Sequence, residues 1–197
     1  MGINKILEKY KLIKTFETEL NVEKETFINE FKKMTEKGYY SPFLIMLDLL
    51  KSENKKYIGN FKESNFIIRQ RFIIDNSFAN NFATVKSEFY TENNKLKVKT
   101  KIQGMAILPF ILRMIIFGIY SLLMFIAILE TLLILFSSDA KHIDGSMIMG
   151  PIILTLFVGF LTYLPYRIAR KNVVNMKDNI DLTYQLIEKT PYNTVYN

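Results

Sequence analysis

The sequence contains no cysteine and a single histidine, His142, among its 197 residues. Without cysteine, the chain forms no disulfide, no thiolate metal site and no thiol nucleophile. A single imidazole supplies neither the usual zinc clusters nor a Ser-His catalytic pair. The sequence also shows no phosphate-binding loop, no dinucleotide fingerprint and no nucleophile elbow. We therefore expect no metal, no cofactor and no enzymatic activity, with a carboxylate-based hydrolase as the one enzyme class left open.

Charged residues are almost absent from two long apolar segments in the second half of the chain, residues 105–136 and 147–166. A bilayer core of about 30 Å needs about 20 apolar residues in a helix, so each segment is long enough to cross it. The polar link between them, residues 137–146, is short and favours a transmembrane helical hairpin. The net charge of +7 would ordinarily suggest nucleic acid as a partner. Because the membrane segments explain this charge, we expect the lipid bilayer as a partner and no nucleic acid.

The distribution of lysine and arginine around these segments predicts their orientation. Loops on the cytoplasmic side of a membrane are enriched in these residues. The link carries only Lys141, whereas basic residues flank both segments on their other sides. We therefore expect a two-pass protein of the bacterial plasma (inner) membrane with both termini in the cytoplasm. The basic residues are Lys97, Lys99, Lys101 and Arg113 before or within the first segment, and Arg167, Arg170 and Lys171 after the second.

The stretch NNKLKVKTKIQG has a lysine at every second position just before the first apolar segment. If its two asparagines form a two-residue turn, Glu88 pairs with Lys99 and Phe89 pairs with Val98. One face of the resulting ribbon is then charged and the other is mainly apolar, as in a half-buried antiparallel sheet. A slip of one residue would destroy both patterns, so we predict this register for the hairpin.

A second hairpin is predicted upstream, in the stretch YIGNFKESNFIIRQRF. A turn at Ser64-Asn65 would pair Phe61 with Ile68, and a three-residue loop is the alternative. The last strand carries Arg69 and Arg71 at alternate positions, so both point to the same face. A concave sheet face with these two guanidinium groups would suit anion binding. The alternative for both arginines is simple exposure to solvent.

Helix signals precede the two hairpins. Apolar spacing, a capping residue and a closing glycine predict a helix over residues 21–38, and Ser-Pro begins another at residue 41. Residues 10–20 fit either a strand or a helix, and their β-branched and aromatic content favours a strand after a short helix. Residues 1–104 are therefore predicted to form a cytosolic α+β domain with an antiparallel β meander and two helices.

The residues after the second apolar segment, 167–197, predict a cytoplasmic amphipathic helix and a tail. Val173, Met176, Ile180 and Tyr184 recur at intervals of three and four residues, which is the period of one helix face. This apolar stripe needs a partner, either the sheet of the same domain or another subunit.

The order of a strand, the helix NVEKETFINEF, a β meander and a two-span hairpin resembles small uncharacterised bacterial two-span membrane proteins with an N-terminal cytosolic α+β domain. The resemblance covers most of the chain and lies in the arrangement of its elements. It implies the fold and the membrane location, and it implies no activity and no site residue.

Two ionisable residues lie within the first apolar segment. Glu130 is about 10 Å of helix rise from the end of the segment at Phe136. An ionisable group in hydrocarbon is costly, so it suggests an ion or proton path or a hydrogen bond to another helix. The alternative is a position near the outer interface. Arg113 suits a phospholipid phosphate or an acidic partner, and the alternative is snorkelling to the inner interface.

Five basic residues near the predicted inner interface suit lipid headgroups, since each such residue near an anionic surface contributes about 1 kcal/mol. The alternative for the strand lysines is a solvated sheet face, because Glu88 and Glu92 offset their charge. For the residues after the second segment, the alternative is a role in setting topology only. The five residues are Arg167, Arg170, Lys171, Lys99 and Lys101.

These features predict an integral membrane protein that presents a cytosolic binding or protein-interaction domain at the inner face of the membrane. Anchoring would raise the local concentration of a protein partner or ligand. The alternative is a subunit of a small homo-oligomeric channel or transporter in which Glu130 lines the pore. Two spans cannot enclose a pathway alone, so this alternative requires a homo-oligomer.

Overall fold

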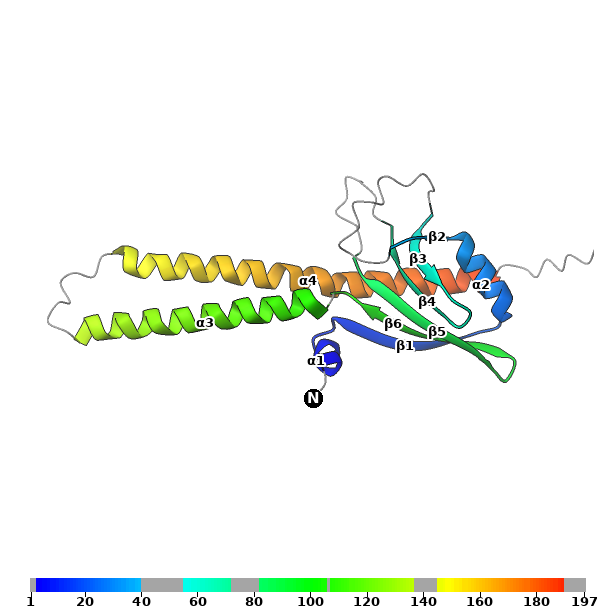
Figure 1. Ribbon diagram of the computed structural model, residues 1–197, viewed down its shortest axis with the longest axis horizontal. Coiled ribbons are helices and arrows are strands. Elements are labelled where there is room, and N and C mark those ends of the chain that lie inside the picture. The colour runs from blue at the N-terminus through cyan, green and yellow to red at the C-terminus, as the bar shows by residue number, and fades with distance from the viewer. Residues whose placement is uncertain (1–2, 40–54, 72–81, 106, 137–144, 190–197) are drawn as a thin grey trace, which may run out of the picture. The chain divides into compact units, whose positions relative to one another are not determined.

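The computed structural model describes residues 3–39, 55–71, 82–105, 107–136 and 145–189 (Figure 1). The chain divides into two compact units. The first unit combines residues 1–105 with 169–197, and the second contains residues 106–168. The helix predicted to begin at residue 41 and most of the link at 137–146 lie outside the described residues.

The first unit is an α+β fold, as the sequence predicted, and it contains a six-stranded sheet with the order β1-β6-β5-β4-β3-β2. A short helix followed by a strand occupies its start, which confirms the interpretation of residues 10–20. The last of the described helices contributes to both units. The elements are α1 (Ile3–Lys9), β1 (Ile13–Leu20), α2 (Lys24–Lys33), β2 (Thr35–Lys37), β3 (Tyr57–Phe61), β4 (Asn65–Gln70), β5 (Thr84–Glu92), β6 (Lys95–Gln103), α3 (Ile107–Phe136) and α4 (Gly145–Lys189).

The sheet is mixed rather than antiparallel throughout, because β2 runs parallel to β3. The sequence predicted one helix as far as Gly38, but α2 ends earlier and β2 follows it. The buried Thr35 hydroxyl donates to the Phe31 carbonyl oxygen over 2.9 Å, which satisfies one of the carbonyl groups left open at the helix end. The backbone N–H of Tyr57 donates to the carbonyl oxygen of Met34 over 3.0 Å. Apolar spacing along the sequence cannot reveal such a long-range contact.

The β5–β6 hairpin has the predicted register, with Glu88 opposite Lys99 and Phe89 opposite Val98. The two asparagines of its turn have φ angles of 52° and 59°, the left-handed conformation that this type of two-residue turn requires. The face that contains Phe89 and Val98 is buried over most of its length, and the lysine face is exposed or half-buried.

The β3–β4 hairpin differs from the prediction by two residues, because Phe61 lies opposite Phe66 instead of Ile68. The turn therefore lies at Glu63-Ser64 rather than at Ser64-Asn65. A shift of two residues leaves every side chain on the same face, so alternation alone cannot distinguish the two registers. The stacked rings of Phe61 and Phe66, with centroids 5.0 Å apart, favour the observed one.

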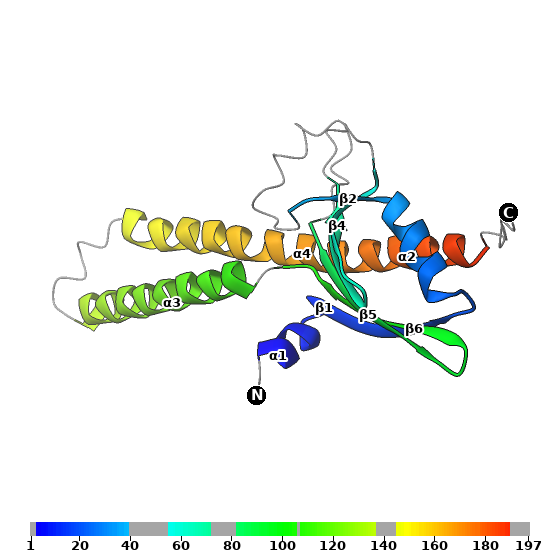
Figure 2. The same cartoon turned by 45° about the vertical axis from the view of Figure 1, so that its right-hand side comes forward.

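The core of the first unit lies between one face of the sheet and two helices, α2 and the C-terminal part of α4. Figure 2 shows this part of α4 running across the strands. Phe27 and Phe31 of α2 contact Tyr184 of α4, with ring centroids 5.8 and 6.2 Å apart. The partner of the apolar stripe is therefore the sheet of its own chain rather than another subunit. The buried residues of the stripe are Val173, Met176, Ile180, Tyr184 and Ile187.

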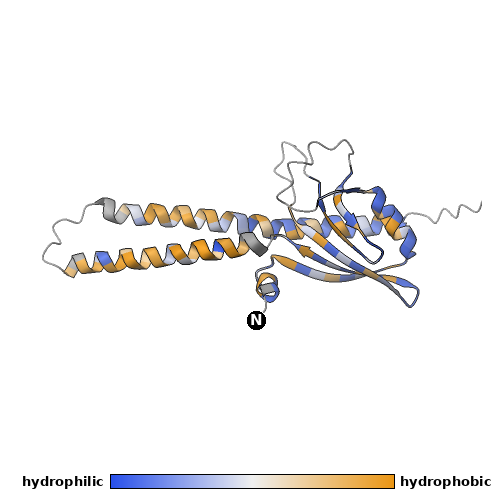
Figure 3. Ribbon diagram, in the orientation of Figure 1, coloured by the Kyte–Doolittle hydropathy of each residue, from blue (hydrophilic) through white to orange (hydrophobic). Residues whose placement is uncertain are grey.

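The second unit contains α3 and the first part of α4, which are long and apolar enough to cross a membrane (Figure 3). α3 closely matches the first predicted segment. α4 is one helix from the start of the second segment to Lys189, as the stripe after this segment predicted. Within this unit, the Tyr120 hydroxyl donates to the Thr155 hydroxyl oxygen over 2.5 Å and links the two helices.

Candidate functional site

The chain leaves the sheet at Gly104 and returns to it in α4 at Ala169, and these two points are in contact. The backbone N–H of Gly104 donates to the carbonyl oxygen of Leu12 over 2.9 Å, which holds the end of β6 beside the start of β1. A Cβ atom at position 104 would lie 2.3 Å from the Ala169 carbonyl oxygen and 2.6 Å from Cγ2 of Val173. Glycine is therefore required for this close approach of strand and helix. These four residues are referred to below as the junction.

Replacing Gly104 with valine is expected to destabilise the first unit by about 1–3 kcal/mol, because the strand end and the helix must move apart. Thermal unfolding of the full-length chain in a mild detergent measures this loss as a lower Tm. Gly118→Val is the matched control, since a Cβ atom at position 118 meets nothing within 4 Å. Equal Tm values for Gly104→Val and the wild type would contradict the close contact at the junction.

Two buried tyrosines connect α4 to the sheet on the core side. The Tyr184 hydroxyl forms a hydrogen bond with Thr100 Oγ1 over 2.8 Å, and Thr100 forms another with Ser87 over 3.0 Å. From the sheet, the Tyr57 hydroxyl pairs with Thr183 Oγ1 over 2.8 Å. Burial raises the pKa of both tyrosines to about 12, so both hydroxyls stay protonated at neutral pH. These directional bonds fix the rotation of this part of α4 against the strands.

Three of the predicted headgroup residues lie at the junction. Arg170 and Lys171 belong to the first turn of α4 within this unit, and both are exposed. Lys101 lies on β6 just before Gly104, and its ammonium group donates to Oδ1 of Asn4 over 3.4 Å. The fold therefore gathers basic residues that are far apart in the sequence.

Of the other two predicted headgroup residues, Lys99 lies outside this group. Lys99 is exposed farther along β6, between acidic residues of β1 and β5 in the sheet register. Arg167, the fifth of these residues, is exposed on α4 and precedes Arg170 by about one helical turn. On the same face as Lys99, the Lys97 ammonium lies 2.7 Å from Glu92 and 3.5 Å from Glu19. The distal part of the lysine ladder is thus an ion-paired, solvated surface.

Arg69 and Arg71 are buried, with only 1% and 8% of their surface exposed. The Arg71 guanidinium forms an ion pair with Glu36 over 3.2 Å, and Arg69 donates to the carbonyl oxygen of Gln70 over 3.2 Å. Glu36 thus supplies a carboxylate where the anion-binding hypothesis expected an external ligand. Sequence reasoning missed this contact because it assigned Glu36 to a helix.

Glu130 and Arg113 both lie on α3, and the structure does not bring them together. They are separated by about 25 Å of helix rise. The side chain of Glu130 is exposed, and it forms no hydrogen bond or ion pair with the part of the chain that the structure describes. Arg113 is half-buried.

Within the described ranges, no group of three or more acidic or histidine side chains is placed to hold a metal ion. Comparisons with protein-family models, with curated proteins and with solved structures give no match. Three geometric features therefore point to function: basic residues that surround the junction, a closed core in the first unit, and exposed apolar helices in the second.

Proposed function

We propose that this chain is a two-pass protein of the bacterial plasma membrane that presents an α+β binding or interaction domain on the cytoplasmic side. The observation that carries the proposal is the contrast between the two units. In the first unit, apolar side chains are buried together in one core. In the second, they are exposed around α3 and α4, for example Leu133 at 72% and Leu156 at 70%. Soluble proteins rarely expose apolar patches of more than a few hundred Å², so this surface suits lipid.

The junction supports a membrane hairpin whose two ends lie on the same side. Side chains from residues 173–187 complete a core whose other members come from residues 16–102, so both parts of the chain must share one compartment. If α3 crosses the membrane, the first part of α4 must cross back for this core to form. The contact between Gly104 and Ala169 suits two crossings that start next to each other.

In this arrangement the two apolar helices anchor the chain in the membrane, and the first unit binds a partner. Anchoring confines the domain to a layer next to the bilayer and raises the effective concentration of a partner that is found there. We assign partner binding to the exposed face of the sheet, which is lined by charged side chains of β1, β5 and β6.

Two measurements test the anchor and its orientation. When membranes that contain the chain are washed at alkaline pH, the chain is expected to stay with the membrane fraction. Because the sequence has no cysteine, a single cysteine at Ser138 in the link or at Thr91 in β5 provides a unique label. We expect an impermeant thiol reagent to label Ser138→Cys in intact cells and Thr91→Cys only after permeabilisation.

Labelling of Thr91→Cys in intact cells would show that the orientation is the opposite of the proposed one. Release of the chain at alkaline pH would show that the two helices do not anchor it. A measurement of ion flux into vesicles that contain the chain also distinguishes the tether from the channel alternative. An ion flux that is present with the wild-type chain and changed by Glu130→Gln would favour a homo-oligomeric channel or transporter instead.

A further inference from the structure

Helix α1 lies at the junction, although its sequence is far from the apolar segments. The backbone N–H of Leu12 donates to the carbonyl oxygen of Leu7 over 2.8 Å, and Lys11 has a left-handed conformation with a φ angle of 59°. This turn folds α1 back beside β1, where Leu7 and Leu12 are fully buried. Leu12 also accepts the hydrogen bond from Gly104. α1 is therefore held at the place where the chain leaves the first unit.

The charged residues at this end of the first unit are almost all basic. Residues 3–14, 101–104 and 169–172 contain seven lysines or arginines and one glutamate. Tyr10, which is 48% exposed, is flanked by lysines on both sides. The seven basic residues, all of them exposed or half-buried, are Lys5, Lys9, Lys11, Lys14, Lys101, Arg170 and Lys171.

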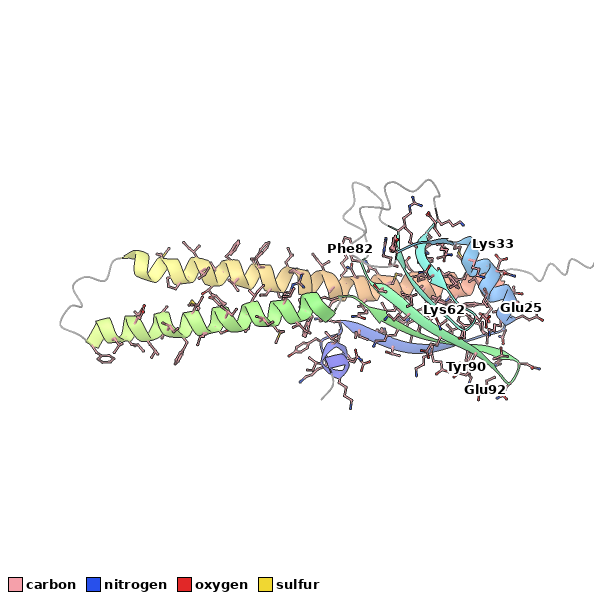
Figure 4. The ribbon with its side chains drawn as sticks, in the orientation of Figure 1. Glu25, Lys33, Lys62, Phe82, Tyr90 and Glu92 are labelled. Carbon is pink, nitrogen blue, oxygen red and sulfur yellow. The ribbon has the colours of Figure 1, made fainter. Side chains whose placement is uncertain are left out.

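The other end of the same unit carries the opposite charge. Residues 17–25, 185–189 and the paired strand ends 88–99 contain seven acidic residues and five basic ones, so their net charge is negative. The first unit is therefore an electric dipole whose positive end is the junction. Figure 4 labels three residues of the acidic end, at α2 and near the β5–β6 turn, well away from α1: Glu25, Tyr90 and Glu92.

We propose that α1 and the turn after it form a second membrane contact, which binds the phosphate groups of anionic lipids. The inference rests on the proposed anchor, because the anchor is what brings the junction next to a bilayer. Each basic residue near an anionic surface favours the bound state by about fivefold. An exposed tyrosine between two lysines fits the headgroup region, where aromatic rings with a polar end are enriched.

This contact makes the orientation of the domain depend on lipid composition. On a neutral bilayer, the apolar helices hold the chain but α1 has no charged surface to bind. On an anionic bilayer, the basic end is attracted and the acidic end, with the β5–β6 turn, is repelled. The fraction of anionic lipid in the membrane then determines how accessible the charged sheet face between these ends is to a partner.

The test uses the full-length chain in vesicles, with a nitroxide label on Asn4→Cys in α1. Collisions of the label with a nickel-chelating lipid report how close α1 lies to the headgroups. We expect more collisions in vesicles of phosphatidylcholine with phosphatidylglycerol than in phosphatidylcholine alone. The same label on Thr91→Cys, at the acidic end, is the matched position and is expected to show no such increase.

Two triple variants separate α1 from general charge effects. Replacing the three lysines of α1 and its turn is expected to lower the equilibrium constant for surface contact on the order of a hundredfold and to remove the increase in collisions. Replacing three exposed lysines elsewhere removes the same charge and is expected to leave the increase intact. The first set is Lys5, Lys9 and Lys11→Gln, and the second is Lys32, Lys62 and Lys189→Gln.

Equal increases in the two triple variants would overturn the contact. The absence of an increase for the wild type, in vesicles that keep the chain through an alkaline wash, would overturn it while leaving the anchor in place. Loss of the chain in that wash would reject the anchor and the inference together. Inorganic phosphate at constant ionic strength is expected not to displace α1 from phosphatidylglycerol, and displacement would assign the site to a soluble phosphate compound instead.

Discussion

Residues 1–105 alone are expected to remain unfolded, whereas the same residues joined to residues 169–197 by a short linker are expected to fold and stay soluble. The reason is that α4 covers the apolar face of the sheet with five buried side chains. Each such side chain contributes about 1.5–3 kcal/mol on burial. Their combined loss, on the order of 10 kcal/mol, is similar to the whole free energy of unfolding of an ordinary domain.

A linker of about six residues in place of residues 106–168 is long enough, because Gly104 and Ala169 are in contact and six residues span up to about 20 Å. Circular dichroism during chemical unfolding should show a cooperative transition for this shortened chain and none for residues 1–105. Met176→Asp, at a fully buried position of α4, is expected to abolish the transition. Val174→Asp, at a position that is 56% exposed, is its control. Cooperative unfolding of residues 1–105 would show that the sheet does not need α4.

The free energy of unfolding of the shortened chain is expected to fall steeply between pH 10 and pH 12. Burial raises the pKa of Tyr57 and Tyr184 to about 12, whereas tyrosine in an unfolded chain ionises near pH 10. In this interval the unfolded state loses protons that the folded state keeps, so unfolding becomes more favourable as the pH rises. Below pH 10 both states keep these protons, and the contribution is constant. Since one pKa unit is about 1.4 kcal/mol, the two tyrosines together account for a loss on the order of 5 kcal/mol.

Urea unfolding at a series of pH values measures this slope. Tyr57→Phe and Tyr184→Phe are each expected to halve it, and the double variant is expected to remove it. Each single variant also costs about 1 kcal/mol at neutral pH, because one partner of a buried hydrogen bond is lost. Tyr10→Phe, at an exposed position, is the control and should change neither quantity. A slope that persists in the double variant would assign the alkaline loss to other groups.

Local patterns were sufficient to predict the β5–β6 hairpin and the helix stripe of α4. In the hairpin, a two-residue turn and burial on one side leave a single register that satisfies both faces. In α4, the spacing of Val173, Met176 and Ile180 follows the helical period, so the buried face could be predicted before its partner was known. Structure was needed to show that this partner is the sheet.

Long-range contacts determine the parts that the sequence did not predict. The parallel pairing of β2 with β3 depends on residues that belong to separate parts of the chain, and so does the ion pair between Glu36 and Arg71. The same reason explains why the site was found only in part. Lys101, Arg170 and Lys171 are close in sequence to the apolar segments, whereas the lysines of α1 reach the junction only because β1 pairs with β6.

A signal for this pairing was present in the stretch TFETEL. Its acidic residues, Glu17 and Glu19, occur at every second position, as do the lysines of β6. In the structure Glu17 lies opposite Lys99 and Glu19 lies opposite Lys97, so the two ladders are complementary in charge. Matching these alternations would have predicted that β1 pairs with β6 and that α1 lies near the end of β6.

Because the first unit is built from both ends of the chain, its completion depends on the order of synthesis. A ribosome adds about 5–20 residues per second, so residues 105–168 take several seconds to appear after the six strands have been made. During this time the sheet has no α4 to cover its apolar face. A chain that stops before residue 169 never acquires this cover. The finished domain therefore forms only after both apolar segments have been made, and incomplete chains are expected to remain unfolded and open to proteolysis.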